Sequence, residues 1–388
     1  MSSEYVNVIT GDARSALEQL PQEHFHVAVT SPPYWTLRDY GATTGTHWPE
    51  VSYRPTPGSR ELVEVKPWDG QLGQEPDTES YIGHLVYVFQ ALWSVLRHDS
   101  SAWLVLGDTY LSARQGAAQK AKDMAGLPWR VALALQATGW WLRSDVIWHK
   151  PNAMPSSATD RPGRDHEYVF LLTKAARYYF DLVAELQPYR SAPRARRGNT
   201  GMRGQSLLSP RSERRADDPG RYWGQGGTNP RTVWSINTMP NGSNHLATYP
   251  LELARRCISL STSQEGCCST CGSPLERQLI RERQLDGEPL VGGWGETSGR
   301  SNFGPRGAGH ERIRTARKTT GWQAPCECDT DNEPCRVLDP FSGVGTTGAA
   351  ALGLGRHYTG IELNPEYANL QKQRLLEHIP LQFAAKGV

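Results

Sequence analysis

The sequence predicts an α/β protein with a mostly parallel sheet and a Rossmann-like nucleotide-binding half near its carboxyl end. One observation is an apolar strand ending at 337–338, which runs into a glycine-rich turn and then a small-residue helix at 346–352. A second observation is another short strand, 357–363, directly after that helix. This strand–helix–strand order is typical of a nucleotide-binding βαβ unit. Because little sequence follows it, we expect the remaining strands of the sheet upstream.

The glycine turn reads Asp339-Pro340-Phe341-Ser342-Gly343-Val344-Gly345-Thr346-Thr347. Glycines let the backbone approach a ligand closely, and Glu362, near the end of the next strand, is placed for the hydroxyls of a ribose. An ordinary glycine turn and a nicotinamide site are the competing interpretations of this spacing. The nicotinamide site is disfavoured because too few residues follow Glu362 to complete a doubly wound sheet.

A second motif lies near the amino terminus, where a β-branched strand at 27–29 runs into Thr30-Ser31-Pro32-Pro33-Tyr34-Trp35. Two consecutive prolines prevent both helix formation and further sheet pairing, so they stiffen a loop. Open α/β sheets bind ligands at the carboxyl ends of their strands. We therefore expect this loop and the glycine turn to meet, although they lie at opposite ends of the chain.

Together the two motifs resemble those of the amino-methylating DNA methyltransferases, which modify N4 of cytosine or N6 of adenine. The resemblance implies that Ser31-Pro32-Pro33-Tyr34 is the catalytic loop and that the glycine turn binds S-adenosylmethionine. It also implies the Rossmann-like fold of S-adenosylmethionine-dependent methyltransferases, in the permuted β order with the cofactor loop last. The cofactor-binding residues that it implies are Asp12, His245, Thr248, Pro250, Asp339, Phe341, Ser342, Gly343, Gly345, Thr346, Thr347, Glu362 and Asn364.

The first part of the chain predicts a strand at 5–9 and a helix at 15–20, with Asp12 between them. In the family an acidic residue here closes over the adenine of the cofactor, and a helix cap is the alternative role. Residues 36–65 are polar and rich in Gly, Thr and Pro. We interpret them as a mobile loop over the active site that meets DNA through Arg38, or else as a simple surface loop.

The middle of the first half alternates apolar segments of helical and extended character. The expected elements are a helix at 78–96, a strand at 102–106, a helix at 128–138, a strand at 140–148, and a closing hairpin of 166–172 with 176–180. Lys150 and Asn152 follow a strand end, so we expect them to line a base pocket or hold a phosphate. Glu167 is expected to be buried and paired.

The composition changes sharply at 190–231, which contains ten arginines against three acidic residues and few apolar side chains. Such a segment does not fold alone, and its positive excess attracts phosphates. It is either a solvated linker or a DNA-engaging segment. The arginines proposed to bind DNA are Arg194, Arg196, Arg197 and Arg203. Order is expected to return at 232–236, and residues 244–250 then resemble the family's additional cofactor-contacting segment, whose following helix points its N-terminus at the methionine carboxylate.

Six of the seven cysteines lie after residue 260, which favours metal binding over disulfides in a cytoplasmic protein. Cys268-x-x-Cys271 and Cys326-x-Cys328 supply four thiolates for a structural zinc site. Cys267 is an alternative to Cys268, and free thiols are the alternative to zinc. Cys257 and Cys335 are expected to be packed and unreactive. The segment 277–318, with nine basic and five acidic residues, is expected to read the target, because arginines contact guanine edges.

The chemistry expected at the Ser-Pro-Pro-Tyr loop is direct transfer to an exocyclic amine of a flipped base. The lone pair of such an amine is delocalised into the ring, and acceptors for both amino hydrogens localise it. Ser31 Oγ and the Pro32 carbonyl are suitable acceptors, and the Tyr34 ring provides a stacking surface. A serine in first position resembles the N4-cytosine enzymes, and its hydroxyl suits cytosine because it can donate to ring N3.

N6-adenine methylation remains the alternative. A non-catalytic DNA-binding or cofactor-sensing protein and an RNA methyltransferase are less favoured, because the motif residues are intact and long basic insertions suit duplex DNA. Methylation at cytosine C5 is rejected, because both Pro-Cys pairs, at Cys326 and Cys335, precede the glycine turn and no Glu-Asn-Val partner is present.

Charge and hydropathy limit the remaining classes. The 42 basic and 40 acidic residues are nearly balanced, and no apolar run is long enough to cross a membrane, so we expect a cytoplasmic protein that engages double-stranded DNA. A cognate restriction endonuclease, the oligomeric state and the recognition sequence stay open. The expected segments are 1–189 as the catalytic part, 190–231 as a basic target-recognition insertion, 232–266 as a return to the core, 267–330 as a zinc-knuckle and basic-loop insertion, and 331–388 as the cofactor-binding part.

Overall fold

The structure, a computed structural model, describes residues 5–37, 46–112, 120–187, 229–238, 249–285 and 313–376. The chain divides into two compact units. The larger unit comprises Met1–Asp181, Arg231–Glu276 and Ala324–Val388, and the smaller comprises Leu182–Pro230 and Arg277–Gln323. Both predicted motifs belong to the larger unit.

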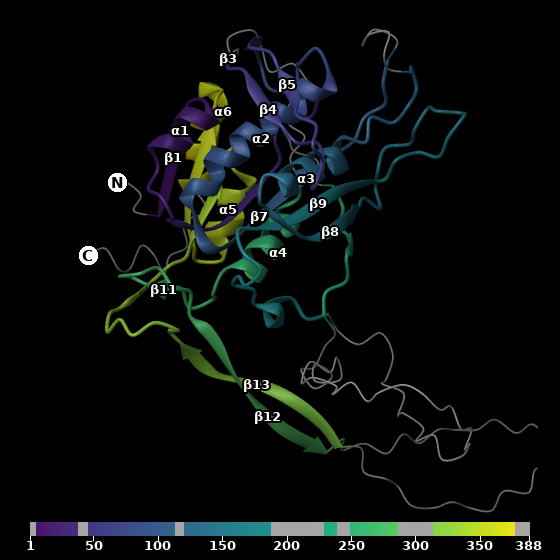
Figure 1. Cartoon of the computed structure of the whole chain (residues 1–388). Coiled ribbons are helices and arrows are strands. Elements are labelled where there is room, and N and C mark those ends of the chain that lie inside the picture. The colour runs from purple at the N-terminus through teal and green to yellow at the C-terminus, as the bar shows by residue number, and fades with distance from the viewer. Residues whose placement is uncertain are drawn as a thin grey trace, which may run out of the picture. The chain divides into compact units, whose positions relative to one another are not determined.

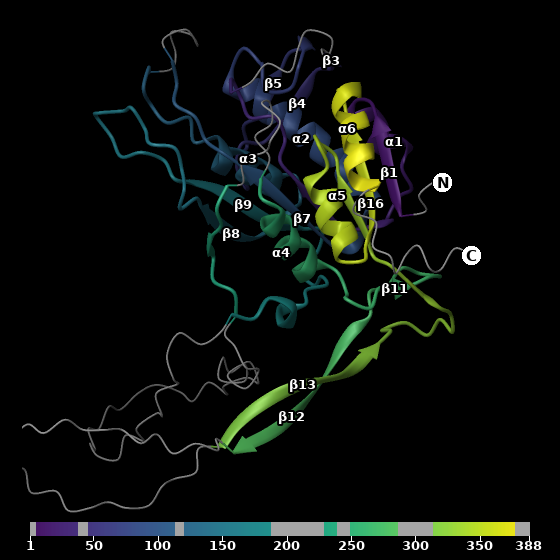
Figure 2. The same cartoon turned by 180° about the vertical axis from the view of Figure 1, so that it is seen from behind.

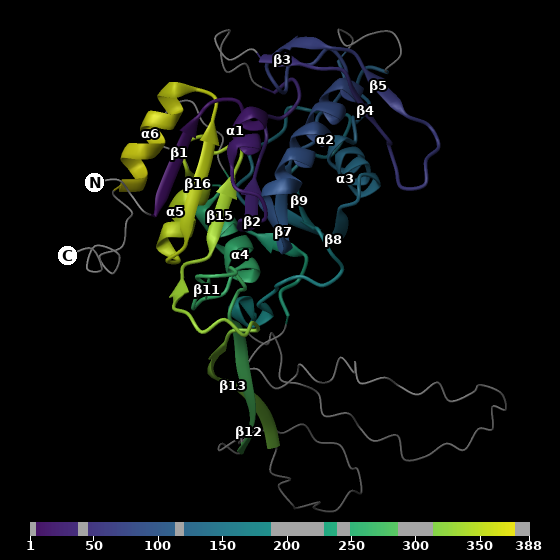
Figure 3. The ribbon, with the colours of Figure 1, turned by 60° about the vertical axis from the view of Figure 1, so that its left-hand side comes forward.

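An eight-stranded sheet forms the centre of the larger unit (Figure 3). In spatial order its strands are β1 (Val6–Thr10), β16 (His357–Glu362), β15 (Arg336–Asp339), β2 (Phe25–Thr30), β7 (Leu96–Leu106), β9 (His166–Thr173), β8 (Trp141–His149) and β10 (Val233–Ser235). The first five strands are parallel, and β9 runs antiparallel to both β7 and β8. The mostly parallel sheet predicted from the sequence is confirmed.

The late strand β15 lies between β16 and β2, and it is parallel to both. Its register with β2 pairs Val337 with Val27 and Leu338 with Ala28. The glycine turn and the Ser-Pro-Pro-Tyr loop therefore leave the sheet at the same edge from neighbouring strands. This is the topological switch point at which open α/β sheets bind ligands.

Six helices of the described chain cover the two faces of the sheet (Figures 1 and 2). The first apolar cluster contains side chains of α1 (Ala13–Gln19), α2 (Thr78–Val95) and α3 (Leu127–Ala137). The second contains side chains of α4 (Leu251–Ser261), α5 (Thr346–Gly353) and α6 (Pro365–Leu376). Alternate residues of β2 serve the two clusters, Ala28 the first and Val27 and Val29 the second, as the pleat of a strand requires. No described helix is long and apolar enough to cross a membrane.

The interpretation of 36–65 as one mobile loop is wrong for residues 46–65. Residues 46–65 contain β3 (Thr46–Trp48), β4 (Val51–Tyr53) and β5 (Val63–Val65), and β3 pairs with β6 (Trp68–Gly70). These three-residue strands form because Trp48, Tyr53 and Val65 are buried in the first cluster. Gly83 of α2 leaves room for them, since a Cβ there would lie 2.7 Å from Val65 Cγ2. Arg38 lies outside the described residues.

The predicted closing hairpin of 166–172 with 176–180 is also wrong. Strand β9 pairs with β7 on one edge and with β8 on the other, so no edge is left for residues 176–180. Those residues instead turn back over the second cluster, where Tyr178 and Phe180 pack.

The smaller unit contains a short 3₁₀ helix, Leu182–Glu185, and the pair β12 (Glu276–Leu285) and β13 (Ile313–Gln323). The Arg277 guanidinium lies 4.2 Å from the centre of the Trp322 ring and donates to Thr319 Oγ1 at 3.1 Å. Residues 188–228 and 286–312 lie outside the described part of the chain. The predicted DNA-binding residues Arg194, Arg196, Arg197 and Arg203 are among them.

Candidate active site

A cavity of about 330 Å³ opens at the carboxyl ends of β15 and β2. Its wall contains residues of both motifs, which confirms that the two ends of the chain meet. From the Ser-Pro-Pro-Tyr loop come Ser31, Pro32, Pro33 and Tyr34. From the glycine turn and its surroundings come Asp339, Phe341, Ser342, Gly343, Thr346, Glu362 and Asn364.

Two backbone features shape the glycine turn. Gly343 and Gly345 have φ values of +52° and +83°, a region that glycine adopts without strain. A Cβ at Gly345 would also lie 2.6 Å from Gln371 Cγ of α6, so this position packs against protein and is not on the cavity wall. Gly343 N donates to Glu362 Oε2 at 2.8 Å, and Asn364 N donates to Glu362 Oε1 at 2.8 Å. The Glu362 carboxylate is thus fixed by backbone amides at the cavity, where burial raises its pKa.

Asp339 joins the elements that surround the cavity. Its buried Oδ1 accepts hydrogen bonds from Thr30 Oγ1 at 2.7 Å and from Phe341 N at 3.1 Å. Its Oδ2 accepts from Thr347 Oγ1 at 2.6 Å and from Tyr249 OH at 3.2 Å. Burial raises the pKa of Asp339, and these four donors oppose that shift. The carboxylate holds β2, β15 and α5 together behind the cavity.

Not every residue predicted to bind the cofactor is among those that line the cavity. Thr347 is fully buried behind the wall, and Pro250 is the N-cap residue of α4, also off the wall. His245 and Thr248 are outside the described ranges. Tyr249, between them and Pro250, does line the cavity and was missed. Its position inside the segment 244–250 was the available signal.

Asp12 lines the cavity and also caps α1. Its Oδ1 accepts from Arg14 N at 2.9 Å and pairs with Arg14 Nε at 2.8 Å. The cap predicted as its alternative role is therefore present, and a role beside the adenine of the cofactor stays a prediction.

The Ser-Pro-Pro-Tyr loop is held in place by contacts with α2 and with the turn that precedes α2. Tyr81 OH donates to the Pro33 carbonyl at 2.9 Å, and Trp35 Nε1 donates to the Glu75 carbonyl at 2.9 Å. Gly73, with φ +94°, passes close behind the loop, where a Cβ would lie 3.1 Å from the Tyr34 carbonyl oxygen. These contacts fix the loop before any ligand arrives.

Tyr34 is tied to a carboxylate of β9. Its hydroxyl donates to Glu167 Oε2 at 2.6 Å, and Ser31 Oγ donates to the Tyr34 oxygen at 3.2 Å. Burial and the Glu167 charge raise the pKa of Tyr34 well above its ordinary value, so the phenol keeps its hydrogen. The Ser31 hydrogen is therefore engaged by Tyr34 in this structure, and its donation to ring N3 of a base stays a prediction.

Lys150 lines the cavity, and its Nζ donates to Glu167 Oε1. The expectation that Glu167 is paired is confirmed, with 16% of its side chain exposed. Asn152 lies off the wall, where its Nδ2 donates to the Thr238 carbonyl at 2.9 Å and its Oδ1 accepts from Thr238 N. Thr238 lines the cavity in its place.

The predicted cysteine pairs come together in the larger unit. The sulfur atoms of Cys268, Cys271, Cys326 and Cys328 all lie within 4.8 Å of one another. The turn between the first two has the form of a metal knuckle, because Gly272 N donates to the Cys268 carbonyl at 2.8 Å and Gly272 has φ +71°. Four thiols at this separation fit a tetrahedral Zn²⁺ site.

Cys267 points away from this group, toward His26 and Cys335. Successive side chains of β11 (Cys267–Cys268), which pairs with β14 (Asn332–Glu333), lie on opposite faces, so only Cys268 joins the four. His26 Nδ1 accepts from Arg336 N at 3.0 Å and Nε2 donates to the Gly272 carbonyl at 2.8 Å. Neither ring nitrogen of His26 retains a lone pair for a metal. We therefore interpret His26, Cys267 and Cys335 as packed side chains. Cys257 and Cys335 are fully buried, as predicted.

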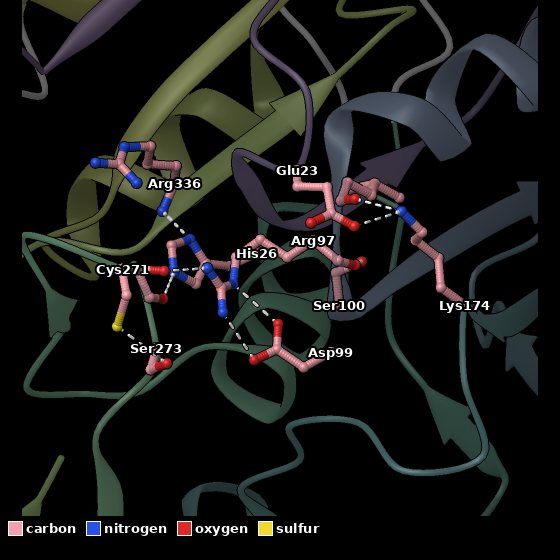
Figure 4. A network of polar contacts seen from close by, with 11 residues as sticks. Glu23, His26, Arg97, Asp99, Ser100, Lys174, Cys271, Ser273 and Arg336 are labelled. Atoms are coloured by element: carbon pink, nitrogen blue, oxygen red, sulfur yellow. Dashed lines mark hydrogen bonds and ion pairs between the residues drawn. The ribbon is translucent and has the colours of Figure 1, made fainter. Parts of the chain in front are cut away.

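The knuckle is attached to the starts of two sheet strands (Figure 4). His26 of β2 binds the Gly272 carbonyl, and Arg97 of β7 donates from Nη1 to the Cys271 carbonyl at 2.7 Å. Arg97 is itself oriented by Asp99 at 2.9 Å. The cysteine cluster thus lies at the end of the sheet opposite to the cavity.

Comparison with known proteins identifies the family. A family model described as DNA methylase, covering N6 and N4 enzymes, matches residues 25–268 and 332–373. The chain belongs to this N6/N4 DNA methylase family. It is a DNA methyltransferase that depends on S-adenosylmethionine.

Two curated relatives are similar over most of their length. Type II methyltransferase M.SmaI of Serratia marcescens is 32% identical over 389 residues, which cover 95% of this chain and 90% of that protein. Type II methyltransferase M.Cfr9I of Citrobacter freundii is 31% identical over 94% of this chain and 86% of that protein. Among solved structures, PvuII DNA methyltransferase (cytosine-N4-specific) aligns with a TM-score of 0.51 at 13% identity, over 97% of this chain and 92% of that chain. At that identity the likeness shows the methyltransferase fold alone.

Proposed function

We propose that this N6/N4 DNA methylase transfers a methyl group from S-adenosylmethionine to the exocyclic N4 of a flipped cytosine in duplex DNA. The observation that carries the proposal is the single cavity shared by Ser31 and Gly343, one from each motif. A cavity of about 330 Å³ at the switch point of the sheet suits a nucleoside-sized ligand beside an extruded base.

The cofactor half of the cavity is proposed around Glu362, whose two oxygens each retain a lone pair after binding the backbone amides of Gly343 and Asn364. Those lone pairs suit the two hydroxyls of a ribose. Asp12, on the same wall, suits the adenine amino group. The bound cofactor supplies an electrophilic methyl group on a sulfonium.

The base half is proposed around the Ser-Pro-Pro-Tyr loop. Because the Ser31 hydrogen is directed at Tyr34, the lone pairs of Ser31 Oγ are available to accept an amino hydrogen. The Pro32 carbonyl is the second acceptor, and the partly buried Tyr34 ring is the surface for stacking. A preorganised acceptor pair of this kind favours the pyramidal amine of the transition state over the planar ground state.

Cytosine is preferred over adenine for two reasons. Serine in the first position of the tetrapeptide resembles the N4-cytosine enzymes. In addition, Lys150 Nζ, on the wall beside Glu167, has two hydrogens beyond the one given to Glu167. Cytosine offers O2 as an acceptor next to N3, where the corresponding edge of adenine carries only C–H. N6-adenine methylation is the second candidate.

The experiment is incubation of the protein with plasmid DNA and labelled S-adenosylmethionine, followed by nucleoside analysis. We expect the label in N4-methylcytosine, whereas label in N6-methyladenine would establish the second candidate. Absence of label on any DNA, with cofactor binding intact, would overturn the proposal in favour of a non-catalytic binding protein. Parallel incubation with RNA tests the remaining substrate class.

We also propose that Cys268, Cys271, Cys326 and Cys328 hold one structural Zn²⁺ that braces the base of the sheet. The basic segments around 190–231 and 277–318, together with Arg38, are proposed to bind DNA and read the target sequence. Since the two curated relatives are named Type II methyltransferases, we also propose that this protein protects DNA from a cognate restriction endonuclease.

A further inference from the structure

One charged pair on the cavity wall, Glu167 with Lys150, has so far been given no part in moving a proton. Glu167 lies at the start of β9 and Lys150 directly after β8, and the antiparallel register that pairs Trp148 with Glu167 brings them together. The Lys150 ammonium also lies 4.4 Å from the centre of the Trp148 ring. Glu167 is therefore held at a fixed position on the wall, with its second oxygen turned toward the Ser-Pro-Pro-Tyr loop.

The hydrogen bonds from that loop to Glu167 run in one direction. Ser31 donates to Tyr34 at 3.2 Å, and Tyr34 donates to Glu167 Oε2 at 2.6 Å. The raised pKa of Tyr34 keeps the phenol hydrogen in place at rest. Because the bonds run from Ser31 to Tyr34 and from Tyr34 to Glu167, a proton that arrives at Ser31 has a continuous path to a carboxylate.

The reaction produces such a proton. Methyl transfer forms an N–CH₃ bond with the nitrogen lone pair and breaks the S–CH₃ bond, whose electron pair stays on sulfur. The nitrogen is left with a positive charge and must lose one hydrogen to give the neutral methylated amine. Ser31 Oγ, proposed above as the acceptor for an amino hydrogen, is the first protein atom that this hydrogen meets.

We propose that Glu167 is the terminal proton acceptor of the methyl transfer, reached through Ser31 and Tyr34. The amine proton passes to Ser31 Oγ, the Ser31 hydrogen passes to the Tyr34 oxygen, and the Tyr34 hydrogen passes to Glu167 Oε2. Ser31 and Tyr34 end as hydroxyls, as they began, and Glu167 ends as a neutral carboxylic acid. Its proton returns to solvent through the cavity before the next turnover. This inference rests on the proposed amino methylation and holds for either base.

The test compares two substitutions that separate shape from proton affinity. Glu167→Gln preserves the length of the side chain and an oxygen that can accept from Tyr34, but it takes up no proton. Glu167→Asp shortens the side chain and keeps the carboxylate. A residue that only positions Tyr34 tolerates Gln better than Asp, whereas a proton acceptor tolerates Asp better than Gln.

The readouts are the single-turnover rate of methyl transfer and the separate dissociation constants for S-adenosylmethionine and DNA. We expect Glu167→Gln to slow transfer about 100-fold or more, in the range of general acid–base contributions, with both dissociation constants within about threefold of wild type. Glu167→Asp is expected to be the faster of the two. Glu18→Gln, an exposed position on α1, is the matched control and should transfer at the wild-type rate.

Further variants test two points. One is whether the Lys150 ammonium, which has no carboxylate partner in Glu167→Gln, causes the loss of rate, and the other is whether the relay runs through Tyr34. Glu167→Gln combined with Lys150→Met removes the unpaired charge together with the proposed donor to cytosine O2, and it should be no faster than Glu167→Gln. Tyr34→Phe breaks the relay at its centre, so adding Glu167→Gln to it should cause little further loss. Any of three results would overturn the proposal. Two of them are methyl transfer by Glu167→Gln at the wild-type rate and methyl transfer by Glu167→Gln faster than by Glu167→Asp. The third result is recovery of the transfer rate when Lys150→Met is added to Glu167→Gln. A wild-type protein that methylates no DNA would instead refute the proposed function.

Discussion

Thr30 Oγ1 and Asp339 Oδ1, 309 positions apart in the chain, share a buried hydrogen bond of 2.7 Å. Thr30 ends the strand that carries the Ser-Pro-Pro-Tyr loop, and Asp339 ends the strand that carries the glycine turn. The bond therefore sets the distance between the proposed base site and the proposed cofactor site. Because both atoms are removed from water, the bond also contributes to the stability of the sheet.

Replacing Thr30 with Val should test this link. The isosteric change removes the donor and leaves Asp339 with Thr347, Tyr249 and the Phe341 amide. We expect the free energy of unfolding to fall by about 1–3 kcal/mol, the range for hydrogen bonds to charged groups, and affinity for S-adenosylmethionine to weaken. Thermal unfolding and calorimetric titration measure the two effects. Thr30→Ser, which keeps a hydroxyl, is the control, and equal behaviour of Val and Ser would contradict the role.

Glu362 should be the side chain on which cofactor affinity most depends. In Glu362→Gln one backbone amide, of Gly343 or Asn364, faces an NH₂ group instead of an oxygen, and one ribose acceptor is lost. Loss of one charge-assisted hydrogen bond corresponds to a dissociation constant about 10- to 100-fold larger. Titration with S-adenosylmethionine measures it, with the exposed Glu366→Gln as control. Unchanged affinity in Glu362→Gln would remove Glu362 from the cofactor site.

Metal content should distinguish the two neighbouring cysteines. Cys268→Ala is expected to lose the proposed zinc and to unfold at a lower temperature, because three thiolates hold the ion less tightly and the knuckle supports His26 and Arg97. Cys267→Ala is expected to keep about one zinc per chain, since its side chain belongs to the group with His26 and Cys335. Elemental analysis of the purified variants decides the point, and the reverse pattern would reject the assignment.

The sequence predicted those parts of the site that are encoded in continuous stretches. The glycine turn, the Ser-Pro-Pro-Tyr loop and the buried face of α2 each carry their pattern locally, so their positions followed from spacing. The partnership of Tyr34 with Glu167 spans 133 positions and depends on β9 lying between β7 and β8. No local pattern encodes that pairing. The three-residue strands β3, β4 and β5 are too short to show an alternation, and their polar neighbours concealed the burial of Trp48 and Tyr53.

The pH dependence of stability should include a contribution from His24. Burial first, then the Arg336 cation and the nearby His26 and His357, lower its pKa from 6.5 to about 4. Because the folded state favours the neutral ring, this contribution is fully present above pH 6.5 and is lost as the pH falls toward 4. His24→Gln should therefore lose less stability than wild type between pH 7 and pH 4.5. Chemical unfolding at both values measures the difference, and parallel losses in the two proteins would exclude His24 as the source.

Gly107, at the end of β7, should be required for the position of the Tyr34 ring. A Cβ there would lie 2.7 Å from Tyr34 Cε2 and 3.5 Å from Glu167 Cδ, so an alanine displaces the ring from the carboxylate that holds its hydroxyl. The glycine turn lies on other strands and keeps its geometry. We expect Gly107→Ala to lower the rate of methyl transfer at least about tenfold while S-adenosylmethionine binds as before, since small displacements of reacting groups cost rate more than affinity. Gly353→Ala, a helical position with open space around it, is the matched control. If Gly107→Ala transfers methyl groups as fast as Gly353→Ala, the Tyr34 ring does not need the place that this glycine leaves for it.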